Sequence, residues 1–298
     1  MLVRIGRLLI TGAIAACVTL SPRFAYAQGH GHAYGHGKQG GVTAGSGSAT
    51  PLPASGAGAR NFGVWLDDAS VAAPGGGWMS VSFGYYRTDL FREFDVPVAD
   101  AGVGLNKRAQ FGFTVPVYNL NMAGAAPARG LGDLYLHSKI QLRDASHGFG
   151  YALVPIVEVA SGVQAEGQRR VNWALPISME VQRNEWRVYG ATGYFSRGSL
   201  FASGALERAI SSQLSITGTL STSYSTKADV VPVPGLSRVR TDVSGGASYA
   251  VRPTWIVFGS LGRTISAHDE NTTILSLSGG VTLNLAAPAD VRTSQKKR

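Results

Sequence analysis

The chain has 298 residues, of which 39 are glycine and 15% are charged, and its mean hydropathy is +0.05. Soluble domains usually carry about 25% charged residues, and a helical membrane protein would be far more apolar, so the composition argues against both classes. The formal charge of +9 is spread along the sequence without a concentrated basic face, which argues against nucleic-acid binding.

The first 27 residues have the pattern of a cleaved secretory signal peptide. Two arginines precede a mostly apolar stretch at 8–20, and Ala25-Tyr26-Ala27 forms a small-x-small cleavage site. We therefore expect export through the general secretory route of a Gram-negative bacterium. A lipoprotein signal, in which the single cysteine Cys17 is lipidated, is the alternative.

Residues 28–60 are rich in glycine, histidine and serine and have almost no large apolar side chain, which predicts a flexible periplasmic extension. His30, His32 and His36 are candidate metal ligands there. A free amine at Gln28, backbone nitrogens and the His30 imidazole would suit a square-planar copper or nickel ion. A plain disordered His-Gly tract is the other interpretation, and we expect no resident cofactor.

From residue 61 to 285 the sequence alternates between apolar and polar residues, the two-residue period of strands that have one apolar face. Eleven segments show this pattern, at 78–88, 107–118, 132–143, 149–160, 171–182, 185–195, 199–209, 212–226, 238–250, 253–265 and 272–285. Most reach the ~9–11 residues that a tilted strand needs to cross a membrane. Aromatic residues such as Trp78, Trp173 and Trp255 lie near segment ends, as in interfacial girdles.

These segments predict an all-β fold, a single antiparallel transmembrane β-barrel of about 12 strands that spans residues 61–285. Bacterial barrels have an even number of strands and short periplasmic turns, so a twelfth strand is expected at Asn61–Asp67, before the first segment. This assignment puts both termini in the periplasm and leaves 89–106 as a long link. Residues 286–298 are predicted to be a basic disordered tail.

In its order of short motifs, the chain resembles the outer-membrane transporter family associated with meta-cleavage pathways of phenol degradation. The motifs are Asp67-Asp68 followed by Gly77-Trp78-Met79-Ser80-Val81, then Gln110-Phe111-Gly112-Phe113-Thr114-Val115-Pro116-Val117-Tyr118, then Gly130-Leu131-Gly132-Asp133-Leu134. Ala160-Ser161-Gly162 departs from the family's Pro-Thr-Gly, and no terminal aromatic residue closes the last strand. The resemblance implies passage of small, often hydrophobic or aromatic, compounds.

If the apolar faces contact lipid, the polar residues between them line the lumen, where side chains tune selectivity. The lumen-lining candidates are Tyr135, His137, Lys139, Gln141, Glu158, Glu180, Gln182, Arg238, Arg240 and Asp242. Their mixed charge indicates no strong preference for cations or anions. The alternative for each of them is a solvated wall residue that only fills the interior.

The function expected from these observations is passive uptake of small solutes across the outer membrane, gated by the longer loops or by the N-terminal extension. The partners expected are outer-membrane lipid, lipopolysaccharide and the solute, with the barrel monomeric. A plugged structural or adhesion barrel is the alternative. A lipid hydrolase that uses His147 or His268 is a third possibility, but no nucleophile pairs convincingly with either histidine, so we do not expect an enzyme.

Overall fold

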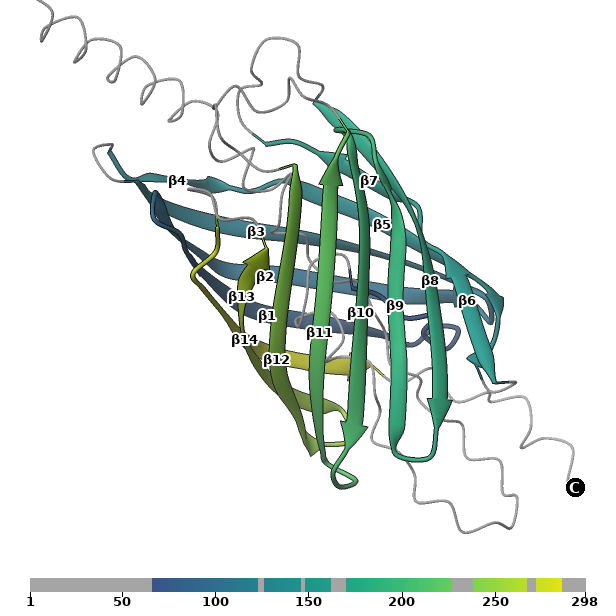
Figure 1. Cartoon of the computed structure of the whole chain (residues 1–298). Coiled ribbons are helices and arrows are strands. Elements are labelled where there is room, and N and C mark those ends of the chain that lie inside the picture. Colours follow the sequence, from purple (N-terminus) through teal and green to yellow (C-terminus); the bar gives the residue numbers. More distant parts are fainter. Residues whose placement is uncertain are drawn as a thin grey trace, which may run out of the picture.

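The computed structural model describes residues 66–122, 126–145, 148–161, 170–226, 238–266 and 272–285, and all its strands belong to one antiparallel sheet (Figure 1). The predicted signal peptide, extension and tail lie outside these ranges. The strands are β1 (Gly77–Arg87), β2 (Phe91–Asn106), β3 (Ala109–Met122), β4 (Ala128–Leu131), β5 (Leu134–Arg143), β6 (Phe149–Leu153), β7 (Ile156–Val159), β8 (Val171–Arg183), β9 (Trp186–Phe195), β10 (Ser199–Ala209), β11 (Leu214–Ser225), β12 (Val239–Arg252), β13 (Trp255–Ser266) and β14 (Leu275–Leu285).

The sheet closes on itself, because β1 pairs with β14 along its whole length, from Gly77 opposite Leu285 to Arg87 opposite Leu275. Two wall strands are each split into consecutive pieces. β4 and β5 both pair with β3, while β6 and β7 both pair with β8. The wall is therefore a closed twelve-strand antiparallel barrel, as the sequence predicts.

Proline accounts for the break between β6 and β7. Pro155 lies in the gap between them and has no N–H to donate to a neighbouring strand. The surrounding backbone bonds continue across the gap, because the Pro155 carbonyl accepts from the Ser138 N–H at 3.0 Å and the Val154 N–H donates to the Pro176 carbonyl at 2.9 Å. The wall therefore stays hydrogen-bonded across the break.

The twelfth strand is β2, inside the stretch 89–106 that the sequence pattern assigns to a link. Of the wall strand expected at Asn61–Asp67, the structure describes Leu66 and Asp67, which are buried inside the barrel and are not part of the closed wall; residues 61–65 lie outside the described ranges. The period of β2 is obscured by a register shift between Asp95 and Val98. With β2 in the wall, the β2–β3 connection is tight and lies at the same end as the connections after β5, β8, β10 and β12.

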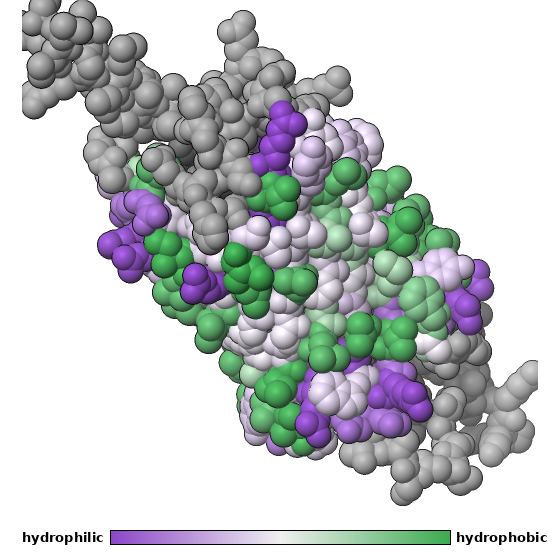
Figure 2. Space-filling view, viewed as in Figure 1, coloured by the Kyte–Doolittle hydropathy of each residue, from purple (hydrophilic) through white to green (hydrophobic). Residues whose placement is uncertain are grey.

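The outer surface is apolar and the inner surface is polar, and β8 shows this alternation most regularly. Its outward residues are largely exposed, as with Ile177 at 47%, whereas inward residues such as Glu180 at 3% are buried. In Figure 2, hydrophobic residues spread over the side of the barrel and hydrophilic ones gather toward its ends. Such an exterior suits a lipid environment, where outward side chains must be apolar.

Aromatic residues lie on the outer surface toward both ends of the wall. Trp186, Tyr249 and Trp255 are exposed at the end with the tight connections, and Trp173 and Tyr224 are exposed at the other end. Two such belts are typical of membrane–water interfaces. Trp78, which the sequence pattern groups with these residues, is instead buried on the inner face, where its indole N–H donates to Asp100.

Candidate functional site

The central feature of the interior is a stretch of chain that precedes β1 and lies inside the barrel. Residues 66–72, here called the lumen segment, are all buried. They lead into a parallel bridge between Pro74 and Gly104, and the Gly75 N–H donates to the Gly104 carbonyl at 2.8 Å. A Cβ on Gly104 would lie 2.2 Å from the Ala73 carbonyl oxygen, so glycine is needed for this close approach.

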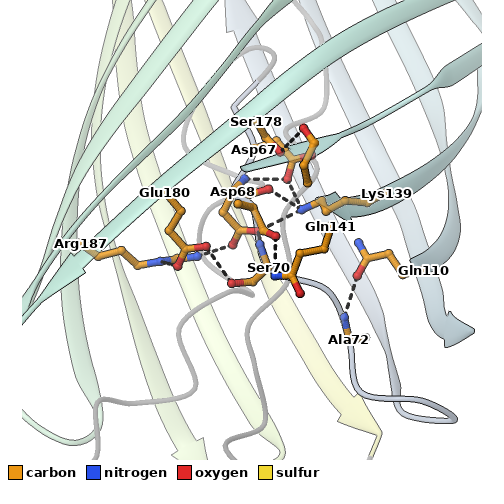
Figure 3. Close-up of polar contacts among 12 residues, drawn as sticks. Asp67, Asp68, Ser70, Ala72, Gln110, Lys139, Gln141, Ser178, Glu180 and Arg187 are labelled. Atoms are coloured by element: carbon orange, nitrogen blue, oxygen red, sulfur yellow. Dashed lines mark hydrogen bonds and ion pairs between the residues drawn. The ribbon is translucent and has the colours of Figure 1, made fainter. Parts of the chain in front are cut away.

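Two cations on the barrel wall hold the lumen segment (Figure 3). The Lys139 ammonium donates to Asp67 Oδ1 at 2.6 Å, to the Asp68 carbonyl at 2.8 Å and to Asp68 Oδ1 at 2.9 Å. The Arg187 guanidinium donates to Asp68 Oδ2 and, at 2.8 Å, to Glu180 Oε1. The carboxylate of Asp68 therefore bridges the two cations.

Neutral and acidic wall residues bind the rest of the lumen segment. Gln141 donates to the Ala69 carbonyl at 2.9 Å, and Gln110 accepts from the Ala72 N–H at 2.8 Å. The Ser70 hydroxyl donates to Glu180 Oε2 at 2.7 Å. The segment thus makes polar contacts with β3, β5, β8 and β9, which lie in one part of the wall in the order β3, β5, β6–β7, β8 and β9.

The first residue of the lumen segment makes a different kind of contact. Leu66 is fully buried in a cluster with Tyr189, Ala205 and Phe258, which point inward from β9, β10 and β13. A buried leucine side chain in such a cluster is worth about 1.5–3 kcal/mol. The segment therefore presents an apolar group and two carboxylates to matching surfaces of the wall.

The charge of Asp68 is stabilised by its position between the cations. Burial favours the protonated acid, but Lys139 and Arg187 outweigh this effect and hold the pKa of Asp68 below its ordinary value. The carboxylate is therefore ionised at neutral pH, and its ion pairs with the wall are at full strength.

A second polar cluster lies at the opposite end of the barrel, around the β9–β10 turn. Arg197 extends from this turn into the barrel and pairs with Glu158 Oε2 at 2.7 Å and with Asp133 Oδ2 at 3.3 Å. Glu158 also accepts from the Tyr135 hydroxyl and from Asn172, each at 2.9 Å. These contacts join the turn to the split strands β4–β5 and β6–β7.

A third cluster lies on β12, at the same end as the Arg197 cluster. Arg240 pairs with Asp242 at 2.9 Å and donates to the Thr273 hydroxyl at 2.7 Å, while Thr264 donates to Asp242 at 2.6 Å. Cations and carboxylates are paired in all three clusters, so the inner wall carries charges of both signs.

Most of the lumen-lining candidates predicted from the sequence lie on the inner face. The buried ones are Tyr135, His137, Lys139, Gln141, Glu158 and Glu180, and Arg240 and Asp242 are partly buried. Gln182 and Arg238 are exposed near strand ends. The structure gathers Lys139, Gln141 and Glu180 around the lumen segment, and it places Tyr135 and Glu158 in the Arg197 cluster. Their roles in solute passage stay predictions.

Sequence reasoning missed the four charged residues that organise these clusters: Asp67, Asp68, Arg187 and Arg197. A signal for Arg187 was available, because it lies between the outward residues Trp186 and Val188 and so must point inward. Arg197 gives no such signal because it belongs to a turn, closed by Gly198 at a φ of 98°. Asp67 is the last residue of the strand expected at Asn61–Asp67, and Asp68 follows it directly, so neither is predicted to line the lumen.

The metal site predicted at His30, His32 and His36 lies outside the described residues, as do His147 and His268. Within the described part of the chain, no group of three His, Cys, Asp or Glu side chains could hold a metal ion. Over the same residues, no helix has the length and apolar character needed to cross a membrane.

No family model and no curated protein matches the sequence. Among solved structures, an outer-membrane channel from Pseudomonas putida F1 is similar, with a TM-score of 0.59 and 14% sequence identity over 73% of this chain and 98% of that one. The NanC porin is also similar, with a TM-score of 0.53 and 9% identity over 70% of this chain and 100% of that one. The fold is that of outer-membrane channels.

Proposed function

We propose that this protein is an outer-membrane channel for the passive uptake of small solutes, with a preference for hydrophobic or aromatic ones. The observation that carries the proposal is a closed barrel whose exterior is apolar and whose interior is lined by paired charges. A polar lumen inside a lipid-facing wall is the architecture of porins. The structural likeness to an outer-membrane channel from Pseudomonas putida F1 supports the same class.

The preference for hydrophobic or aromatic solutes has two supports. One is the resemblance to transporters associated with phenol meta-cleavage pathways. The other is a cluster of inward apolar side chains beside the Arg197 cluster, which includes Tyr135, Phe195 and Phe201. Aromatic rings of a solute would pack favourably on such side chains.

The lumen segment acts in this proposal as a gate. It occupies the end of the barrel with the tight connections and must move aside for solutes to pass freely. The same segment favours a second candidate, a plugged structural or adhesion barrel that transports nothing. The channel and the plugged barrel differ in one respect: weakening the contacts of the lumen segment should increase solute passage through the channel but not through the plugged barrel.

The test is solute entry into liposomes that carry the refolded chain from residue 28 onward. We expect benzenesulfonate to enter faster than a pentose of similar size, and both to enter faster than into empty liposomes. A sulfonate is used because it stays charged and does not cross the bilayer unaided. In the Asp67→Asn/Asp68→Asn variant, entry should rise roughly tenfold, because hydrogen bonds between charged groups are each worth about 1.5–3 kcal/mol.

The matched control is Asp89→Asn/Glu185→Gln, which removes two exposed carboxylates outside the lumen and should leave entry unchanged. No entry of either solute through the native chain or the Asp67→Asn/Asp68→Asn variant, with both folded by circular dichroism, would favour the plugged barrel. Equal entry of benzenesulfonate and pentose would retain the channel but remove the aromatic preference.

A further inference from the structure

Three hydrogen bonds from the Lys139 ammonium all end on the lumen segment, on the Asp67 carboxylate and on the carboxylate and carbonyl of Asp68. An ammonium group has three protons to donate, so all three hydrogen bonds that Lys139 can donate go to residues of the lumen segment, which comes before the first wall strand. Its side chain is fully buried in the interior. If the segment left, this cation would lose all three of these partners.

Arg187 differs from Lys139 because wall residues also hold it. Its guanidinium donates to Glu180 Oε1 at 2.8 Å and lies 3.8 Å from Glu207 Oε2. With the lumen segment gone, Arg187 would keep these two carboxylates. The vacated space would therefore contain one cation without a directly paired carboxylate, Lys139, beside an arginine that keeps its two wall carboxylates and regains the donor used for Asp68.

A buried cation without a counter-ion is strongly unfavourable, so the vacated site would attract an anion of suitable shape. The Asp68 carboxylate defines that shape, because its Oδ1 accepts from Lys139 and its Oδ2 accepts from Arg187. A carboxylate of another molecule would fit between the same two donors. Gln141 and Gln110 would add neutral donors and acceptors once they lose the segment backbone.

Beside these cations lies an apolar surface. Leu66 is fully buried against Tyr189, Ala205 and Phe258, two residues along the chain from the bridging carboxylate of Asp68. The guanidinium of Arg187 lies over the Tyr189 ring, 4.5 Å from its centroid, so the cationic and the apolar contacts of residues 66–68 meet at this pair.

We infer that the wall around Lys139 and Arg187 is a binding site for small organic acids with an apolar body, and that the chain's own residues 66–68 occupy it as an internal ligand. A solute of this class competes with the lumen segment for Lys139 and Arg187 and opens the channel by taking its place. The inference rests on the proposed channel function and gives it a substrate class and a means of gating.

The probe for the test is 4-methylpentanoate, which combines a leucine-sized apolar body with one carboxylate. Its binding to the full chain in detergent is measured by titration calorimetry. The Asp67→Asn/Asp68→Asn variant should bind it roughly tenfold more tightly than the native chain, because an internal competitor lowers the fraction of chains that can bind. The Asp89→Asn/Glu185→Gln variant should match the native chain.

Two comparison ligands separate the two parts of the site. The neutral amide 4-methylpentanamide lacks the charge, and acetate lacks the apolar body, so both should bind the Asp67→Asn/Asp68→Asn variant at least tenfold more weakly than 4-methylpentanoate. Adding Lys139→Gln to this variant should remove binding of the acid. The Gly104→Ala variant keeps both carboxylates but crowds Ala73, and should also tighten binding.

Equal binding of the acid and the amide would overturn the assignment of a carboxylate site. The assignment would also be overturned if the acid failed to bind the Asp67→Asn/Asp68→Asn variant. This result does not depend on whether the variant that adds Lys139→Gln folds. These results are independent of the channel function, because benzenesulfonate entry into liposomes is a separate readout. If benzenesulfonate enters the liposomes but 4-methylpentanoate does not bind, only the inferred binding site is wrong and the proposed channel function stands.

Discussion

At the scale of single residues, the lumen is organised by long-range ion pairs. Lys139 and Arg187 reach Asp67 and Asp68 across sequence separations of 72 and 119 residues. These groups are buried, so each charged residue depends on its partner. Removing one member of a pair leaves an uncompensated buried charge, which lowers stability by about 3–5 kcal/mol. Protonation of Asp67 or Asp68 therefore weakens the seated state of the lumen segment, in which these carboxylates pair with Lys139 and Arg187.

The pH dependence of transport follows from Asp68. Its pKa is below the ordinary value, so its ion pairs stabilise the seated segment above about pH 4 and weaken as the pH falls from there through the lowered pKa. We expect benzenesulfonate entry to be constant between about pH 5 and 8 and to rise below about pH 4. The charged and titratable groups around Asp68 are Asp67, Lys139, Glu180, Arg187, Tyr189 and Glu207.

The control for this pH profile is the Asp68→Asn variant. Through it, benzenesulfonate should enter the liposomes at a high rate at neutral pH, and this rate should rise less in acid than it does with the native chain. If benzenesulfonate entry through the native chain rose already at about pH 6, the pH dependence could not be assigned to Asp68, because that is the range in which histidines titrate.

At the scale of elements, β8 and β2 show when a local pattern is sufficient. β8 (Val171–Arg183) alternates without interruption, so its outward residues can be read from the sequence. β2 (Phe91–Asn106) changes phase between Asp95 and Val98 and carries Pro97, so its two-residue period is broken. Both strands nevertheless pair with two neighbours, β2 with β1 and β3 and β8 with β6–β7 and β9.

The lipid-facing assignment of β8 is tested by placing a charge at two depths. Ile177→Arg, at the middle of the strand, should lower the free energy of unfolding in lipid by about 2–4 kcal/mol, because arginine is unfavourable at the bilayer midplane. Val181→Arg, on the same face but near the strand end, should cost about 0–1 kcal/mol. Urea titration of the barrel in vesicles measures both, and equal effects would argue against a membrane-spanning β8.

At the scale of the whole molecule, the barrel has two different ends. Short connections follow β2, β5, β8, β10 and β12, whereas the other end holds the long connections after β7, β11 and β13, the short ones after β1 and β9, and the Arg197 cluster. Short turns face the periplasm in bacterial barrels. We therefore expect the lumen segment to enter from the periplasmic end and the Arg197 cluster to face the outside.

Cysteine labelling tests this orientation, and the only native cysteine is Cys17. Asp89→Cys, in the β1–β2 connection, should react with a membrane-impermeant maleimide in intact cells. Glu185→Cys, in the β8–β9 turn, should react only after the outer membrane is permeabilised. The reverse pattern would invert the barrel and place the gate at the cell surface.

The sequence by itself determined the wall of this protein. Period-two alternation depends on each residue and its immediate neighbours, so it predicts eleven of the strands and which side chains of β8 face lipid. It also indicates the inward position of Lys139 and Glu180. The secretory signal, the extension and the histidine site stay predictions, since they fall outside the described residues.

The tertiary structure decided what fills the wall. Two adjacent aspartates look the same in a strand, a loop or a lumen segment, and only the position of residues 66–72 inside the barrel brings Asp67 and Asp68 within reach of Lys139 and Arg187. The twelfth strand was likewise decided by pairing, because β1 and β3 require a partner that the interrupted pattern of β2 conceals. Contacts between residues far apart in the sequence depend on how the strands and the lumen segment are arranged in space, which no local pattern encodes.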